Sequence, residues 1–167
     1  MKQKKRWISM YVENRSGVLA RIAGKMSGKA YNIDSITTGT TEDPPVSRMT
    51  IGLSSDDATF EQIKKQLNRC VEIIKVIDIT DAPTHIKELL FIHIHDCSEI
   101  EKAEIFRVAQ VFDAKPIDYG IDSVLLESVN TESRNNDIIE LLTKKFKNLE
   151  IVRGGVVAIE SISMRDR

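Results

Sequence analysis

The sequence is poor in several residue types that mark particular classes of protein. Only 5% of its 167 residues are aromatic, and its two cysteines, Cys70 and Cys97, do not form a CxxC pair. Such isolated cysteines indicate reduced thiols in a cytosolic protein and not a disulfide framework. No apolar run reaches the ~18 residues that a membrane-spanning helix needs. The basic N-terminal residues are not followed by an apolar segment, so we expect no signal peptide and a cytoplasmic location.

An excess of charge of either sign is also absent. Lys and Arg number 24, against 25 Asp and Glu. A balanced chain exerts no long-range attraction on a polyanion, so we expect neither nucleic acid nor a membrane among its partners. What is present is typical of a globular protein, with 41% hydrophobic and 29% charged residues. A chain of this length can bury a core without disulfides or metal.

The hydrophobic pattern of the first half predicts a complete α+β unit. Strands are expected where apolar residues alternate or β-branched residues gather, and helices where apolar residues recur every three or four positions. The predicted order is strand, helix, strand, strand, helix, strand, at residues 7–12, 18–26, 31–40, 49–53, 60–67 and 71–79. This is the order of the ferredoxin-like βαββαβ unit. The segment 81–84 then breaks the pattern, and it predicts a boundary between a domain of residues 1–81 and one of residues 85–167.

The same order recurs in the second half. A strand is predicted around Leu90–Ile94, and Ser98 with Glu101 forms the sequence signature of a capping box. The helix that follows is expected to bury a stripe of four residues, namely Ala103, Phe106, Ala109 and Phe112. Two strands, a helix and a last strand complete the unit, at 114–119, 123–129, 138–146 and 152–159. The fold class is therefore α+β with two ferredoxin-like domains.

Residues that could carry catalysis do not form a recognisable constellation. The sequence contains neither a phosphate-binding loop nor a GxSxG nucleophile elbow. The best cluster is His93, His95 and Cys97, which share one side of a predicted strand. Successive residues on that side lie roughly 7 Å apart, which is wide for one ion. We interpret this side as polar or partner-facing, and we predict no catalytic residue and no metal site.

One turn between a strand and a helix has the character of a ligand site. It reads Asn14-Arg15-Ser16-Gly17, with Ser16 as the expected N-cap. The first N–H groups of a helix lack acceptors, and a glycine lets a ligand carboxylate approach them closely. Asn32 begins the next predicted strand, and its side-chain amide could form hydrogen bonds with the ligand's polar groups. On this pattern alone, a capped helix without a ligand remains the alternative.

Several segments of the first half, in order, resemble the opening of one family. They are residues 12–22, 31–37, 47–51, 61–67 and 71–76. Looser matches follow at 104–107, 112–115 and 153–158. The resemblance is to the small regulatory subunits of acetolactate synthase. It implies an N-terminal ACT domain, which is a ferredoxin-like amino-acid sensor, and a C-terminal domain of related topology.

The resemblance also implies a function. Members of this family form dimers through their ACT domains and bind branched-chain amino acids, usually valine, at that interface. They have no catalytic activity, and they activate a catalytic large subunit and confer feedback inhibition on it. No cofactor is expected in this chain, because thiamin diphosphate and magnesium belong to the large subunit. The implied effector site contains the turn with the next two residues from one protomer and the start of a strand from the facing one. Its residues are Asn14, Arg15, Ser16, Gly17, Val18 and Leu19, then Asn32 and Ile33.

Two other functions fit the same predicted fold. The chain could be a stand-alone ACT sensor that controls a different enzyme or transcription. It could also be a small enzyme such as an acylphosphatase, whose phosphate loop Asn14 and Arg15 faintly resemble, but with the wrong glycine spacing.

Overall fold

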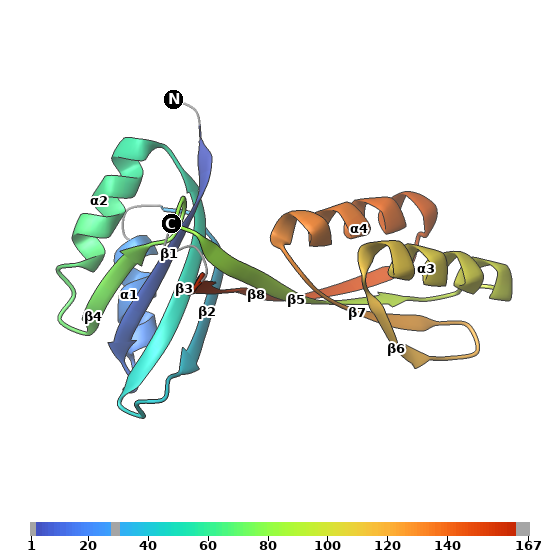
Figure 1. Ribbon diagram of the computed structural model, residues 1–167, viewed down its shortest axis with the longest axis horizontal. Coiled ribbons are helices and arrows are strands. Elements are labelled where there is room, and N and C mark those ends of the chain that lie inside the picture. Colours follow the sequence, from blue (N-terminus) through green and yellow to red (C-terminus); the bar gives the residue numbers. More distant parts are fainter. Residues whose placement is uncertain (1–2, 28–30, 163–167) are drawn as a thin grey trace. The chain divides into compact units, whose positions relative to one another are not determined.

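The computed structural model describes residues 3–27 and 31–162 (Figure 1). The first six elements are β1 (Lys4–Glu13), α1 (Val18–Ser27), β2 (Ile33–Thr40), β3 (Val46–Ser55), α2 (Asp57–Leu67) and β4 (Ile73–Asp78). The next six are β5 (Thr84–Ile94), α3 (Glu99–Phe112), β6 (Lys115–Tyr119), β7 (Val124–Asn130), α4 (Glu132–Lys145) and β8 (Leu149–Glu160). The predicted βαββαβ order is confirmed in both halves.

Each half builds one four-stranded sheet. The strand orders are β2-β3-β1-β4 and β6-β7-β5-β8, so the first and third strands of each half lie in the middle. In both sheets the described strand pairs are antiparallel. The two helices of each half lie on one face of its sheet, as Figure 1 shows. The helices of the described residues leave the other face of each sheet uncovered, although Val156 near the end of the chain contacts Thr37 of the first sheet.

Each sheet buries its own core beneath its helices. In the first core, alternate residues of β1 and β3 meet the apolar stripes of α1 and α2, and Met10, Ile51 and Ile63 are fully buried. In the second, Ile92 of β5 and Leu126 of β7 meet α3 and α4. Cys70 is buried, and both cysteines are free thiols, as predicted. Period-two strands and period-3.6 helices therefore explain both cores.

The contacts divide the chain into two compact units. One contains residues 1–85 and 156–167, and the other contains residues 86–155. This differs from the predicted division, which kept everything after residue 85 together. Two hydrogen bonds show why the end of the chain groups with the first unit. The hydroxyl of Thr37 donates to the carbonyl of Val156 over 2.5 Å, and the amide of Ser161 donates to the carbonyl of Pro83 over 2.8 Å.

The buried stripe of α3 lies one residue away from the predicted one. The helix buries Ile105, Val108 and Ala109, whereas Ala103 is exposed and Phe106 packs at the edge against Tyr119. The prediction is confirmed for Ala109, which is buried, and for Phe112, which packs against the second core. It was wrong for Ala103 and Phe106, because a lysine occupies a core position of the true stripe. Lys102 is only 1% exposed. Its ammonium group donates 2.7 and 2.9 Å hydrogen bonds to the Glu99 carboxylate and the Gly120 carbonyl, which offsets the cost of burying the charge.

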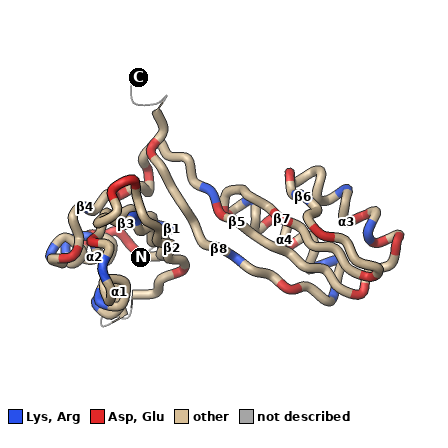
Figure 2. Tube along the Cα trace, turned by 90° about the horizontal axis from the view of Figure 1, so that it is seen from below, with Lys and Arg blue, Asp and Glu red and all other residues tan. Residues whose placement is uncertain are grey.

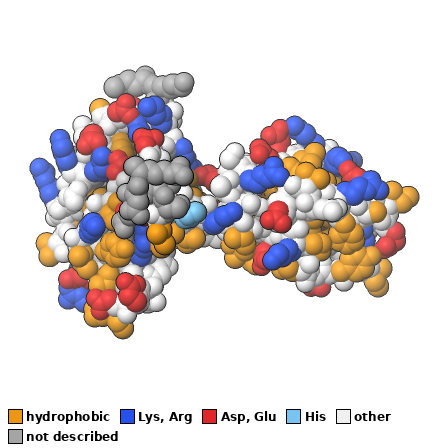
Figure 3. Space-filling model, viewed as in Figure 1, with side chains coloured by type: hydrophobic (Ala, Val, Ile, Leu, Met, Phe, Trp, Pro, Cys, Tyr) orange, Lys and Arg blue, Asp and Glu red, His pale blue; other side chains and the backbone are white. Residues whose placement is uncertain are grey.

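Charged side chains of both signs are spread along the whole trace (Figure 2). On the face in Figure 3 basic and acidic side chains are intermingled, in keeping with the balanced composition. Within residues 3–27 and 31–162, every helix is too short or too polar to cross a bilayer.

Candidate effector site

The predicted effector turn is anchored to the loop between β2 and β3. Strand β1 ends at Glu13 and α1 begins at Val18, so residues 14–17 form the connection. The side-chain amide of Asn14 donates to the carbonyl of Pro44 over 2.9 Å, and its backbone N–H donates to the carbonyl of Pro45 over 2.7 Å. Asn14 therefore holds the turn in place. The sequence placed Asn14 in the site but gave no signal for its proline partners.

Gly17 has the conformation that the turn requires. Its φ is +84°, in the left-handed region that residues with a side chain adopt rarely. A Cβ atom added at Gly17 would meet no atom within 4 Å, so the space beside the turn is open. Because α1 begins at Val18, Gly17 and not Ser16 occupies the N-cap position, and that part of the prediction was wrong. A glycine cap offers no side-chain acceptor to the first helical N–H groups. The N–H of Val18 donates instead to the carbonyl of Arg15 over 3.3 Å, so the N–H groups after it are the ones offered to a ligand.

The charges around the turn favour an anion at the helix start. The first turn of α1 contains no acidic residue, so nothing there offsets the positive end of the helix dipole. The Arg15 guanidinium group forms an ion pair with Glu13, and this hydrogen-bonded partner raises the pKa of Arg15. Arg15 therefore faces the end of β1. The backbone of the turn, and not this side chain, offers positive charge to a ligand.

The two apolar residues after the turn take different positions. Val18 is only 3% exposed and belongs to the first core, so it serves as a support for the turn. Leu19 is exposed on the first turn of α1 and can contact an apolar ligand side chain. Of these two predicted site residues, the structure leaves Leu19 accessible.

Asn32 and Ile33 lie at the opposite end of the same sheet. Ile33 pairs with Leu53 of β3, whereas Glu13 pairs with Val46, seven residues earlier on that strand. At about 3.3 Å per residue this separates the two parts of the predicted site by roughly 23 Å. Asn32 is exposed, and its amide donates to Asp34 over 3.2 Å. One chain therefore does not assemble the predicted site by itself.

The histidine cluster also differs from the prediction. His93 lies on β5 and His95 directly follows its last residue, Ile94, whereas Cys97 lies further beyond the end of this strand. Asp96, with φ of 55°, turns the chain so that Cys97 enters the second core. There its thiol donates to the carbonyl of Asp122 over 3.2 Å, and burial raises its pKa. A buried, protonated thiol is inert, so Cys97 has neither a catalytic nor a metal-binding arrangement.

Comparisons with known proteins assign both halves to one family. Residues 8–75 match the family model of the acetolactate synthase small subunit-like ACT domain, and residues 87–162 match that of the small subunit of acetolactate synthase. The chain belongs to the acetolactate synthase small-subunit family.

Relatives of this family cover the chain almost completely. The acetolactate synthase small subunit of Aquifex aeolicus is 39% identical over 93% of this chain and 81% of its own length. A probable small subunit of Archaeoglobus fulgidus is also 39% identical, over 93% of this chain and 96% of its own. The crystal structure of the small subunit from Thermotoga maritima superimposes with a TM-score of 0.83 at 34% identity, covering 95% of this chain and 98% of its own. Both the fold and the family of the chain are thus established.

Proposed function

We propose that this chain is the regulatory subunit of an acetolactate synthase, which activates a catalytic large subunit and confers feedback inhibition by a branched-chain amino acid. The observation that carries the proposal is the open, glycine-capped start of α1 in a member of the small-subunit family. In this proposal the chain has no catalytic role, and thiamin diphosphate and magnesium belong to the large subunit. An amino acid would place its carboxylate at the N–H groups at the start of α1 and its side chain near Leu19.

The complete effector site requires two copies of the chain. β2 is an edge strand of its sheet, so its outer side can pair with another strand. In an antiparallel β2 pair about a two-fold axis, the Asn32 end of one strand lies beside the Thr40 end of the other. Thr40 and Val12 both pair with Ser47, so this end of the sheet is the one that carries the effector turn. A homodimer formed through β2 would therefore bring the partner's half of the site to the turn.

Control of the large subunit follows if the effector stabilises one arrangement of this dimer. Contacts that exist only in that arrangement couple effector binding to the large subunit, with a coupling free energy of about 1–3 kcal/mol in typical allosteric proteins. An apolar wall distinguishes ligands by about 1–3 kcal/mol per methylene. Leu19 would thus favour the branched side chains of valine, leucine and isoleucine over smaller ones.

The test is reconstitution with a catalytic large subunit. Acetolactate formation from pyruvate is measured for the large subunit alone, for this chain alone and for the mixture, each with and without valine, leucine or isoleucine. We expect activity from the large subunit, none from this chain alone, stimulation in the mixture, and inhibition of the stimulated activity by at least one of the three amino acids.

Gly17→Asp is the variant that isolates the site. Its carboxylate would occupy the ligand's position and repel the ligand's charge, so the stimulated activity should persist while inhibition is lost. Gly24→Asp is the matched control, because Gly24 is also exposed with open space around it but lies within α1, away from the turn. Inhibition that survives Gly17→Asp unchanged would refute the assigned site.

The alternative of a stand-alone sensor predicts a different result. Such a protein would bind a branched-chain amino acid but would neither co-purify with the large subunit nor stimulate it. Turnover of pyruvate by the purified chain alone would refute both readings.

A further inference from the structure

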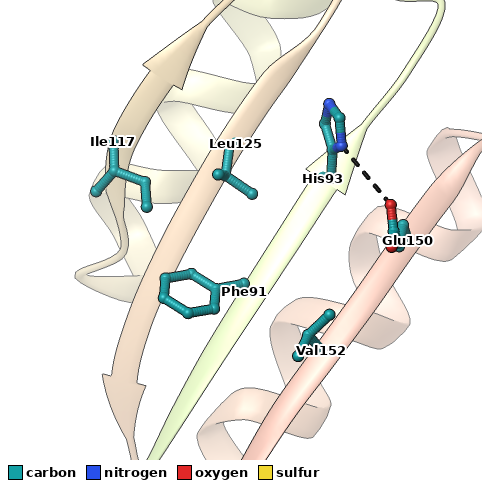
Figure 4. Close-up of a pocket in the computed structure, with 6 residues that line it drawn as sticks. All are labelled: Phe91, His93, Ile117, Leu125, Glu150 and Val152. Atoms are coloured by element: carbon teal, nitrogen blue, oxygen red, sulfur yellow. Dashed lines mark ion pairs between the residues drawn. The ribbon is translucent and has the colours of Figure 1, made fainter.

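Three side chains from two strands converge on the open face of the second sheet. His93 on β5 and His95, which directly follows the end of this strand, alternate with the buried Ile92 and Ile94, so they point away from the core. Glu150 lies on β8, the neighbouring strand. Figure 4 shows His93 and Glu150 pointing toward one another across the two strands. A backbone hydrogen bond from His95 to Asn148, 2.9 Å long, fixes the two strands beside each other at this point.

The two imidazole rings are much closer than the spacing along a strand suggests. Their centroids are 3.7 Å apart, because both side chains lean toward each other. Oε2 of Glu150 lies 3.8 Å from Nδ1 of His93 and 3.8 Å from Nε2 of His95. One donor atom from each of the three residues lies within 4.8 Å of the other two. The objection that the histidines are too far apart for one ion therefore does not hold in the folded chain.

The polar atoms of these three side chains lie close together but form no hydrogen bonds with one another. A separation of 3.8 Å is too long for a hydrogen bond, so neither histidine donates to Glu150. Among the residues that the structure describes, none is hydrogen-bonded to the side chain of His93, His95 or Glu150. Two ring nitrogens and a carboxylate oxygen thus face one small space. That is the arrangement of an N,N,O ligand set.

We propose that His93, His95 and Glu150 form a binding site for a divalent transition-metal ion of the Zn²⁺ class. Imidazole nitrogen and carboxylate oxygen are ordinary zinc ligands, with bonds of about 2.0–2.2 Å. Donor atoms around a tetrahedral ion of that bond length lie about 3.4 Å apart. The donor atoms must therefore approach one another by up to about 1.4 Å. The exposures of the three side chains, 36%, 41% and 66%, leave them free to do so.

The ion would link two strands and keep an open coordination position. The part of the chain that the structure describes supplies three ligands here, so a fourth position is left for water or a group from another molecule. His93 and Glu150 also border a cavity of about 290 Å³, whose other lining residues are apolar: Phe91, Ile117, Leu125 and Val152 (Figure 4). By joining β5 to the edge strand β8, the ion would stabilise the second sheet.

The chain contains its own control for a binding experiment. Of its three histidines, His85 alone lies outside the cluster. Metal-free full-length chain is titrated with Zn²⁺ by calorimetry, and with Co²⁺ by visible absorption, which reports the ligand field directly. We expect one ion per chain and a rise in melting temperature with Zn²⁺.

Variants decide whether these three residues are the ligands. His93→Ala, His95→Ala and Glu150→Gln should each weaken Zn²⁺ binding at least about tenfold, since loss of even an outer-shell partner costs metal sites that much. His85→Ala should bind as the wild type does. Circular dichroism of each variant verifies its fold, and Glu150→Gln preserves the shape of its side chain. A flat wild-type titration, or equal affinities in all four variants, would overturn the proposal. Neither result tests the proposed control of the large subunit by a branched-chain amino acid.

Discussion

Removing the guanidinium group of Arg153 should destabilise the second unit strongly. Arg153 on β8 donates two hydrogen bonds to the Glu88 carboxylate, of 2.9 Å from Nε and 2.7 Å from Nη2. This carboxylate also accepts a 3.1 Å hydrogen bond from the fully buried Asn135, whose own side-chain oxygen accepts one from Ser128. In Arg153→Met, Glu88 would remain buried and would lose the guanidinium group that donates the 2.9 and 2.7 Å hydrogen bonds.

The size of the destabilisation follows from how deeply the side chains of Glu88 and Arg153 are buried. Loss of one partner from a buried ion pair costs about 3–5 kcal/mol, because the remaining charge is left uncompensated. The Glu88 side chain is 4% exposed, but that of Arg153 is 35% exposed, so water already reaches part of the pair. We discount the cost for this screening and expect a loss of about 2–3 kcal/mol. Arg153→Lys should lose less, because it keeps the charge but not the two-pronged geometry.

The assay is urea denaturation followed by far-ultraviolet circular dichroism, with the free energy of unfolding extrapolated to water. The double variant Glu88→Gln/Arg153→Met separates two contributions to the loss of stability: the cost of burying the Glu88 charge without the guanidinium group, and the cost of lost packing. It should be more stable than Arg153→Met, because no buried carboxylate is then left to lose the guanidinium group. Unfolding of Arg153→Met within about 0.5 kcal/mol of the wild type, as for an ordinary surface substitution, would refute the reasoning.

Two further predictions follow from the effector site and from the start of α3. Asn32→Ala should weaken binding of the branched-chain effector to the dimer, and calorimetry that gives wild-type affinity would remove Asn32 from the site. The Ser98 hydroxyl and amide groups donate 2.7 and 2.8 Å hydrogen bonds to Glu101, completing the predicted capping box. These hydrogen bonds hold the pKa of Glu101 below its usual range, about 4.3 in peptides. These hydrogen bonds therefore stabilise the folded chain at pH values above about 4.3. Their contribution is lost as the pH falls through the lower pKa that Glu101 has in the folded state. Melting temperatures measured on acidification should therefore fall less steeply in Glu101→Gln, and parallel curves would contradict this.

Local patterns sufficed for most of the fold. The alternation of Ile8, Met10 and Val12 correctly predicted β1, and the pair Ser98 and Glu101 correctly predicted where α3 begins. Such patterns work because the side of an element that faces the core is fixed by its own repeat. They failed in α3, where Lys102 occupies a buried position. The groups that satisfy its charge include Gly120, 18 residues away, and no helical periodicity reports such a partner.

The effector site and the proposed metal site also depend partly on local sequence and partly on tertiary structure. The sequence by itself determined the strand-to-helix turn with Gly17 at its end, because the need for φ of +84° and for open space is local. Only the tertiary structure decided that Asn32 lies at the far end of the sheet, that Cys97 turns into the core, and that Glu150 meets His93 and His95. Those outcomes depend on strand order and register between segments up to 57 residues apart. Pairing of that kind is set by how whole sheets bury their apolar faces, which no short stretch of residues encodes.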